Sequence, residues 1–183
     1  NPGIDHYLAE DLPKLKAAGA FVISNVAGHC DDDYAAVVEK LADSDADMLE
    51  INVSCPNVSA GGMSVGTDPV ALANLMDRLR PMTDKPMIVK LTPNVTDITE
   101  IAKACEAAGA DGISLINTLF GMKIDLKRRR PVLANKAGGY SGPAVKPVAV
   151  RMVYQVYEAV KIPIVGMGGI SSAEDVLEFM LAG

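Results

Sequence analysis

The chain has 183 residues, of which 49% are hydrophobic and 22% are charged, and it carries a net charge of −6. This size and composition suit one globular domain and exclude a disordered protein, and the acidic balance argues against a general nucleic-acid binder, which needs a basic face. No apolar run approaches the ~18 residues of a membrane span, and three scattered cysteines make neither a disulfide framework nor a zinc site, so we expect a cytoplasmic protein without a metal centre.

Short runs rich in β-branched residues recur along the chain and predict the strands of one sheet. Each run is almost continuously apolar, which is typical of parallel strands that are buried on both faces. In chain order the predicted strands are "AFVISNV" (20–26), "MLEINVS" (48–54), "PMIVKLT" (86–92), "GISLINT" (112–118) and "IPIVGMG" (162–168).

Between these runs, apolar residues recur at i, i+3, i+4 and i+7, which predicts helices with one face against the sheet. The periodic segments are 34–41, 72–79 and 98–105. Capping signals fit the same boundaries. They are Asp68 before Pro69, Asp97 with Glu100, Ser171 with Glu174, and Gly109 at a helix end.

The alternation of strands and helices predicts an α/β fold with right-handed crossovers. Every predicted strand ends in polar or glycine-rich residues, which favours a (β/α)8 TIM barrel over a doubly wound sheet, where ligands bind chiefly at one switch point. Five strands in 183 residues fall short of a full barrel of roughly 250 residues. We therefore expect one partial TIM-barrel domain over residues 1–183, with about five of the eight βα units and truncated at both ends.

Cys55 is the candidate for acid–base chemistry. Its thiol follows a predicted strand and lies between Asn52 and Asn57 in the sequence, whereas a core cysteine would lie among apolar residues. A thiol has an ordinary pKa of about 8.5, so it can take up and release a proton near neutrality. A nucleophilic role would need a histidine partner, and neither His6 nor His29 lies in a recognisable motif. We favour a general base, with a purely structural thiol as the alternative.

Amide side chains stand at two predicted strand ends. Asn52 and Asn57 flank the thiol in the sequence, and Asn117 and Thr118 close another strand. Paired amide donors and acceptors suit a flat ligand with an alternating imide edge. Asx turns that only stabilise loops are the alternative, which is weaker for Asn52 because this residue lies within a strand.

Lys90 is a charged residue inside the apolar strand "IVKLT". A buried lysine is costly without an anionic or strongly polar partner. We therefore expect Lys90 to line the barrel and to face a cofactor ring or its developing anion. The alternative is that its side chain reaches water at the strand end.

Two glycine-rich segments, "GGYSGPA" (138–144) and "GMGGI" (166–170), each open a predicted helix. Bare backbone N–H groups at a helix N-terminus can hold a phosphate, and barrels often bind phosphate in their late loops. The two segments together predict a phosphorylated ligand.

Three further features have ordinary structural explanations. The run "KRRR" (127–130) is predicted to be a solvated loop rather than a nucleic-acid patch. Cys105 lies on the apolar face of its helix and is expected in the core. Cys30, in "GHCDDD", fits a turn that begins a helix better than a metal site.

Taken together, these motifs resemble the dihydroorotate dehydrogenase family, flavin enzymes of pyrimidine biosynthesis. Cysteine at position 55 is similar to class 1 of that family, whereas class 2 has serine there, and "GGMSVGTDP" with "RRPVLANKAGG" resembles the NAD-linked class 1B more than the fumarate-linked class 1A. Tyr140 departs from the family, which usually has leucine there. The resemblance runs along essentially all 183 residues, through "NPGID", "NVAG", "EINVSCPNVSAGGMSVGTDP", "IVKLTPNVTDI", "GISLINT", "RRPVLANKAGGYSGPAVKPVAVRMVYQVY" and "IPIVGMGGI".

The resemblance implies a barrel that oxidises (S)-dihydroorotate to orotate, in which Cys55 removes the C5 proton while FMN accepts the C6 hydride. It also implies a homodimer core and a separate subunit, carrying FAD and a 2Fe-2S cluster, that passes the electrons to NAD. The implied substrate contacts are Asn52, Asn57, Asn117 and Thr118. The implied FMN contacts are Asn25, Asn52, Lys90, Ile116, Gly142, Gly168 and Gly169.

Three other interpretations remain open. A flavin module like that of dihydropyrimidine dehydrogenase would share the fold and the cysteine, but we would expect histidine in place of Asn57. A flavin-free isomerase or lyase acting on a sugar phosphate would use the glycine loops alone. A non-catalytic barrel serving as a binding module would need no thiol base.

Overall fold

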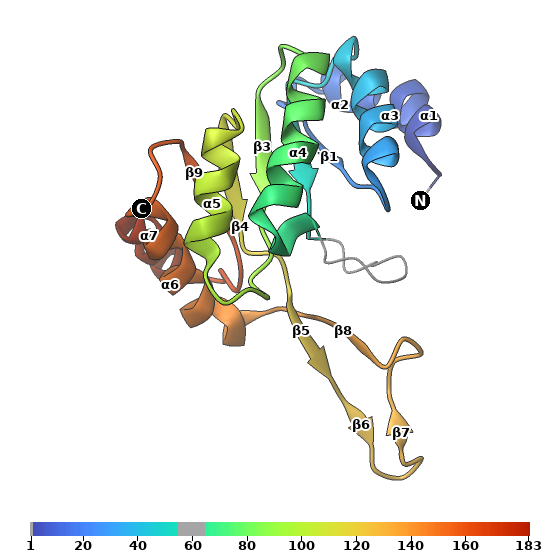
Figure 1. Cartoon of the computed structure of the whole chain (residues 1–183). Coiled ribbons are helices and arrows are strands. Elements are labelled where there is room, and N and C mark those ends of the chain that lie inside the picture. Colours follow the sequence, from blue (N-terminus) through green and yellow to red (C-terminus); the bar gives the residue numbers. More distant parts are fainter. Residues whose placement is uncertain (1, 55–64) are drawn as a thin grey trace.

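The computed structural model describes residues 2–54 and 65–183 and shows a parallel sheet flanked by helices (Figure 1). The sheet has the strand order β1-β2-β3-β4-β9, and all of its neighbouring pairs are parallel. Its strands are β1 (Ile23–Val26), β2 (Met48–Asn52), β3 (Met87–Lys90), β4 (Gly112–Leu115) and β9 (Ile164–Gly166). Alternating β/α units in this order confirm the predicted α/β class and form part of a TIM barrel.

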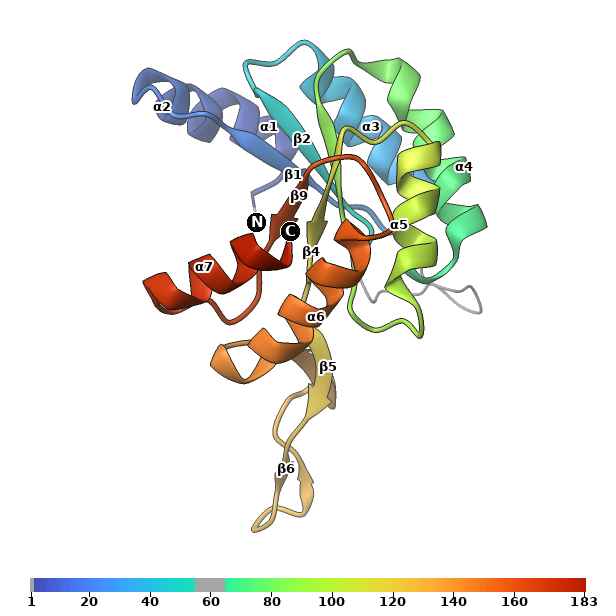
Figure 2. The same ribbon diagram turned by 90° about the vertical axis from the view of Figure 1, so that its left-hand side faces the viewer.

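Four helices cover one face of the sheet, and each packs against the next along the chain (Figure 2). They are α3 (Asp31–Ala42), α4 (Pro69–Leu79), α5 (Ile98–Ala107) and α6 (Lys146–Tyr157). The remaining helical elements are α1 (Ile4–His6), the π-helix η1 (Tyr7–Asp11), α2 (Leu12–Ala17), α7 (Ala173–Ala182) and the 3₁₀ turns η2 (Val65–Thr67), η3 (Arg80–Met82) and η4 (Pro143–Val145). No helix of the described residues is both long and apolar enough to cross a membrane.

The core lies between the sheet and these four helices. Side chains alternate across each strand, so Leu49 and Ile51 of β2 are fully buried against the helices, while Met48, Glu50 and Asn52 lie on the other face, which we call the inner face. The buried positions of α4 and α5 match the predicted periodicity. Burial of this apolar stripe stabilises each helix on the sheet by roughly 25 cal/mol for each Å² removed from water.

Burial on both faces holds in the centre of the sheet but not at its margins. In β4 every residue is buried. The prediction was wrong for β1 and β9, where Ile23 and Val165 are 46% and 47% exposed. These strands lie at the two ends of the strand order, so their inner-face side chains have neighbours on one side only among the described residues.

The helix caps follow the sequence with one shift. Asp68 accepts hydrogen bonds from the backbone N–H groups of Val70 and Ala71, and Asp97 accepts one from Thr99, as expected for N-caps. At α7 the predicted pair Ser171 and Glu174 was wrong by one residue. The capping box joins Ser172 and Asp175 instead, because aspartate at N3 reaches the cap as glutamate would.

An antiparallel ribbon between β4 and α6 was not predicted. We call residues 119–140 the arm, and Figure 1 shows it extending away from the sheet. In the arm, β5 (Leu119–Met122) pairs with β8 (Ala137–Tyr140), and β6 (Ile124–Asp125) pairs with β7 (Arg130–Pro131). The run 127–130 is exposed at its tip, as predicted. The segment 138–144 is therefore not simply a loop, because its first half belongs to β8.

Candidate active site

A polar cluster occupies the inner face where four neighbouring strands end. Glu50 accepts a hydrogen bond from Asn25 Nδ2 at 2.6 Å and another from Ser114 Oγ at 2.7 Å. Lys90 Nζ lies 3.9 Å from Glu50 Oε2, and the two side chains are only 21% and 13% exposed. The lysine therefore lies over the sheet beside an anion, which supplies the charged partner that its burial requires.

Glu50 was missed in the sequence analysis, although a signal for it existed. It interrupts the apolar run "MLEIN" in the same way that Lys90 interrupts "IVKLT". The register places Asn52 opposite Lys90 and Glu50 opposite Ile88, so the acid and the base lie diagonally on one face. A pair of opposite charges in adjacent inward-facing positions could have been proposed from the alternation alone.

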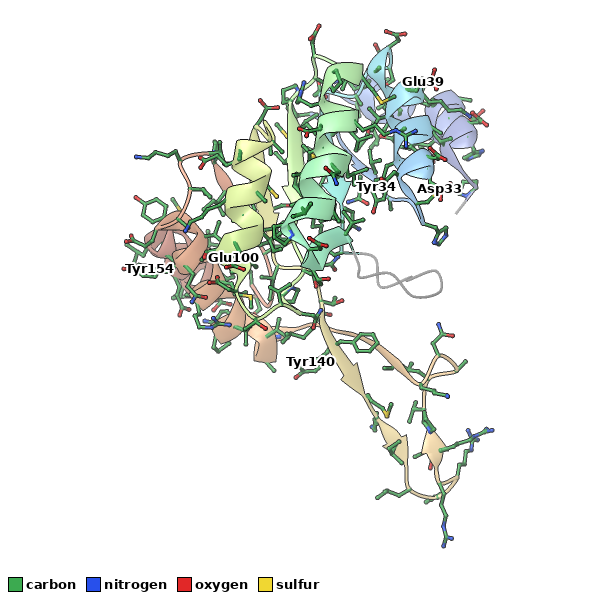
Figure 3. All side chains as sticks on the ribbon, viewed as in Figure 1. Asp33, Tyr34, Glu39, Glu100, Tyr140 and Tyr154 are labelled. Atoms are coloured by element: carbon green, nitrogen blue, oxygen red, sulfur yellow. The ribbon has the colours of Figure 1, made fainter. Side chains whose placement is uncertain are left out.

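Asn52 is fixed from several directions at the end of β2. Its side-chain Oδ1 accepts a hydrogen bond from Asn117 Nδ2 at 3.3 Å and another from the Ser54 backbone N–H at 3.3 Å. Its carbonyl accepts a bond from the hydroxyl of Tyr34, a residue of α3 that Figure 3 labels. The structure thus brings together two of the predicted substrate-binding amides.

The segment around Thr118 is held by Asn94, which the sequence analysis did not single out. Asn94 Nδ2 donates to the Thr118 carbonyl at 3.0 Å, and Asn94 Oδ1 accepts from the Phe120 N–H at 2.9 Å. Thr118 also packs on the arm, since a Cβ built on Gly139 would overlap its hydroxyl. Tyr140 lies at the base of the same arm (Figure 3). The Asn94 side chain therefore links Thr118, a candidate substrate-binding residue, to Phe120 at the start of the arm.

The two glycine segments lie in contact, as a shared phosphate site requires. Gly142, Gly168 and Gly169 have φ angles of +102°, +124° and +76°, which side-chain-bearing residues rarely adopt. A Cβ on Gly169 would lie 2.7 Å from the Gly142 carbonyl oxygen, and one on Gly168 would lie 3.2 Å from Ile116 Cγ1. Ile116 is buried against this loop. Bare backbone is therefore required where the two loops meet.

Lys146, Asp175 and Glu178 form an ion-pair cluster next to the second glycine segment. Lys146 Nζ lies 2.6 Å from both Asp175 Oδ1 and Glu178 Oε2. The other Asp175 oxygen accepts bonds from the N–H groups of Ser171 and Ser172. The Lys146 bond, followed by the Ser171 N–H, holds the pKa of Asp175 well below its ordinary value.

Two predicted site residues, Cys55 and Asn57, lie outside the described residues. Ser54, the residue before the cysteine, donates from Oγ to the Lys90 carbonyl at 2.9 Å, which ties the end of β2 to β3. Cys105 is buried, and desolvation raises the pKa of its thiol to about 12, so it is a core residue as predicted. Cys30 is exposed at the N-cap of α3, and the described residues contain no cluster of three metal-ligating side chains.

The parallel β/α sheet, with polar side chains gathered at the carboxyl ends of its strands, places this chain among the α/β-barrel proteins. The sequence profile of the dihydroorotate dehydrogenase family matches residues 1–183, and the chain belongs to that family.

Similar proteins include two that are each 57% identical over 183 residues, from Alkaliphilus metalliredigens and Lachnoclostridium phytofermentans, and one from Bacillus cytotoxicus that is 53% identical over 184 residues. Each is described as the catalytic subunit of dihydroorotate dehydrogenase B (NAD(+)). All of this chain is covered in these comparisons, and it spans 60–61% of the length of those relatives.

Proposed function

We propose that this chain belongs to a class 1B dihydroorotate dehydrogenase, which oxidises (S)-dihydroorotate to orotate in pyrimidine biosynthesis. The observation that carries the proposal is the bond between Asn52 and Asn117 at 3.3 Å, with Lys90 at the register position beside Asn52. Two joined amides next to a cation match the imide edge and the negative charge of dihydroorotate. We further propose that residues 1–183 belong to one FMN-binding barrel domain.

The residues present fit an FMN cofactor. Its phosphate would lie in the glycine cradle, where a Cβ on Gly169 would meet the Gly142 carbonyl oxygen at 2.7 Å, and bare N–H groups there can donate to phosphate oxygens. Lys90, Asn25 and Asn52 lie on the inner face and supply polar groups for the ring, while Gly168 and Ile116 pack beside the cradle. When bound, FMN supplies the acceptor for the C6 hydride.

The chain itself would supply orientation and proton transfer. We assign Cys55 as the base that removes the C5 proton, because the thiol follows the strand end where Asn52 and Ser54 are held in place. Asn52, Asn117, Thr118 and Asn57 would bind the pyrimidine ring. Asn52 and Asn117 are already aligned by their mutual bond, so less orientational entropy is lost when the substrate binds.

The partner proposal rests on the names of the relatives, which are described as catalytic subunits of an NAD(+)-linked enzyme. We propose a homodimer core with an electron-transfer subunit that carries FAD and a 2Fe-2S cluster. The flavin protein alone should then reduce dyes with dihydroorotate but reduce NAD poorly. NADH formation at 340 nm should appear when that subunit is added, and efficient NAD reduction without it would contradict the partner proposal.

The activity itself is tested with the full-length polypeptide that carries this chain. It should purify yellow, and dihydroorotate should bleach the flavin band under anaerobic conditions. Absence of any flavin band would instead favour a flavin-free barrel isomerase or lyase. Bleaching by dihydrouracil but not by dihydroorotate would favour a module like that of dihydropyrimidine dehydrogenase, and a flavin that neither compound reduces would favour a non-catalytic barrel.

A further inference from the structure

Glu50 of β2 contacts side chains of three other strands, β1, β3 and β4, on the inner face. Both carboxylate oxygens are in use, one bonded to Asn25 of β1 at 2.6 Å and the other to Ser114 of β4 at 2.7 Å. The Lys90 ammonium of β3 lies 3.9 Å from the first of these oxygens. A single anion therefore contacts the two side chains, Asn25 and Lys90, that are proposed to face the flavin ring.

This arrangement favours one direction for the positive charge of Lys90, toward Glu50. An ammonium on a four-carbon stem is flexible and turns toward the nearest anion, and the side chain of Glu50 is only 13% exposed, so water screens the pair weakly. Glu50 is in turn fixed by its two hydrogen bonds, so it offers Lys90 an anion in one place. The same carboxylate places a negative charge beside the proposed ring site.

We propose that Glu50 is a positioning residue that orients Lys90 and Asn25 toward the flavin and lowers the midpoint potential of the bound cofactor. The inference rests on the proposed function, since it concerns the same site. A two-electron reduced flavin carries additional negative charge, which a neighbouring carboxylate repels and a neighbouring ammonium attracts. With Glu50 present, the positive charge of Lys90 is partly neutralised, and the oxidised flavin is favoured.

The test is the Glu50→Gln variant of the full-length flavin protein, because glutamine keeps the shape but removes the charge. We expect the midpoint potential, measured by dye-coupled reductive titration, to rise by an amount equal to about a tenfold shift in the reduction equilibrium, or about 30 mV. The control is Glu10→Gln, which removes an exposed carboxylate from its pair with Lys14 and should leave the potential unchanged.

A double variant separates positioning from a structural role and also covers the case in which Glu50→Gln does not fold. Lys90→Met should lower the midpoint potential. Adding Glu50→Gln to Lys90→Met should raise the potential again, but by less than about 30 mV, because part of the effect of Glu50 passes through Lys90. Equal midpoint potentials in the parent and in Glu50→Gln would overturn the proposal. If Glu50→Gln does not fold, the deciding comparison is between Lys90→Met and the double variant, and equal potentials there would overturn it.

The titration does not use dihydroorotate as reductant, so the two proposals can fail separately. If dihydroorotate does not bleach the flavin but Glu50→Gln raises the midpoint potential, the proposed function is wrong and the role of Glu50 stands. If bleaching occurs and the potentials are equal, only the role of Glu50 is wrong. A protein that binds no flavin at all overturns both.

Discussion

Asn117 donates a hydrogen bond from its side-chain amide to Asn52 Oδ1 over 3.3 Å, although the two residues are 65 positions apart in the chain. They come from the ends of β4 and β2, with β3 between them in the sheet. The bond therefore connects residues of β2 and of the segment after β4 past the end of β3, whose Lys90 pairs in register with Asn52. Loss of either amide would leave the other without this partner, so the two should act as one recognition unit.

The first prediction concerns Cys55, the proposed base. Cys55→Ala should keep the flavin but slow its reduction by dihydroorotate about 10²–10⁴-fold, the usual effect of a lost general base. The measurement is stopped-flow absorbance of the flavin band.

Cys105→Ala is the matched control. Its thiol is buried with a pKa of about 12, so it stays protonated and takes no part in catalysis. The substitution should cost about 1 kcal/mol of unfolding free energy and leave the rate of flavin reduction unchanged. If both variants reduced flavin at the parental rate, Cys55 would be a structural residue.

The second prediction compares two glycines with nearly the same positive φ angle. Gly169 and Gly19 have φ angles of +76° and +75°, but an added Cβ would lie 2.7 Å from the Gly142 carbonyl oxygen in the first case and would meet nothing within 4 Å in the second. Gly19→Ala should cost about 1 kcal/mol from backbone strain alone. Gly169→Ala should cost more and should also lower the flavin content of the purified protein. Equal flavin content in the two variants would show that Gly169 does not contribute to flavin binding.

The third prediction concerns the link between the β3–α5 loop and the arm. Asn94→Ala removes the bonds to Thr118 and Phe120, which should cost about 1–3 kcal/mol of unfolding free energy. Because Thr118 and Asn117 lose their support, we expect the KM for dihydroorotate to rise while the flavin content stays constant.

Asn94→Asp should restore part of the effect, since its carboxylate can still accept from the Phe120 N–H. Asn74→Ala, on the exposed side of α4, should change neither KM nor stability by a measurable amount. A KM that did not respond to Asn94→Ala would show that Asn94 only stabilises the fold.

The fourth prediction follows from the lowered pKa of Asp175. Lys146 and the Ser171 N–H stabilise the ionised carboxylate in the folded state, so its stabilising effect is present above the unfolded pKa, near 4, and is lost as pH falls through the lower folded pKa. Asp175→Asn should therefore be less stable than the parent at pH 7. Urea titrations across pH 2–7 should show the difference shrinking below pH 4. A difference that stayed constant with pH would mean that the carboxylate charge contributes nothing.

Local features of the fold could be predicted from the sequence. The caps at Asp68 and Asp97, the helix end at Gly109 and the central strands depend on short-range geometry and periodicity, which neighbouring residues determine. The position of the second glycine segment at a strand end followed from the rule that parallel strands end at one edge, whereas the first segment begins in β8 of the arm, so its contact with the second could not be derived from that rule. Ser171 and Ser172 are both suitable caps with an acidic residue at N3, and the observed box uses Asp175, whose other oxygen pairs with the distant Lys146, so local sequence could not decide between them.

Non-local features could not be predicted. The strands of the arm have only two to four residues each, which is too short for an alternation of apolar and polar residues to be recognised. Asn94 and Glu50 owe their roles to partners 24 to 64 positions away. No local pattern distinguishes Asn94 from an ordinary loop residue. Glu50 does interrupt an apolar strand, but its bonds to Asn25 and Ser114 depend on the order of the strands in the sheet.

Charge is distributed unevenly between the arm and the rest of the chain. It contains six of the 17 Lys and Arg residues and one of the 23 Asp and Glu residues, so it carries +5 while the rest of the chain carries −11. Because the arm projects from the sheet, these opposite charges are separated in space and give the molecule a large electric dipole (Figure 1). Such a dipole turns the arm toward acidic surfaces during approach, and the effect weakens as salt shortens the screening length to ~8 Å at 0.15 M.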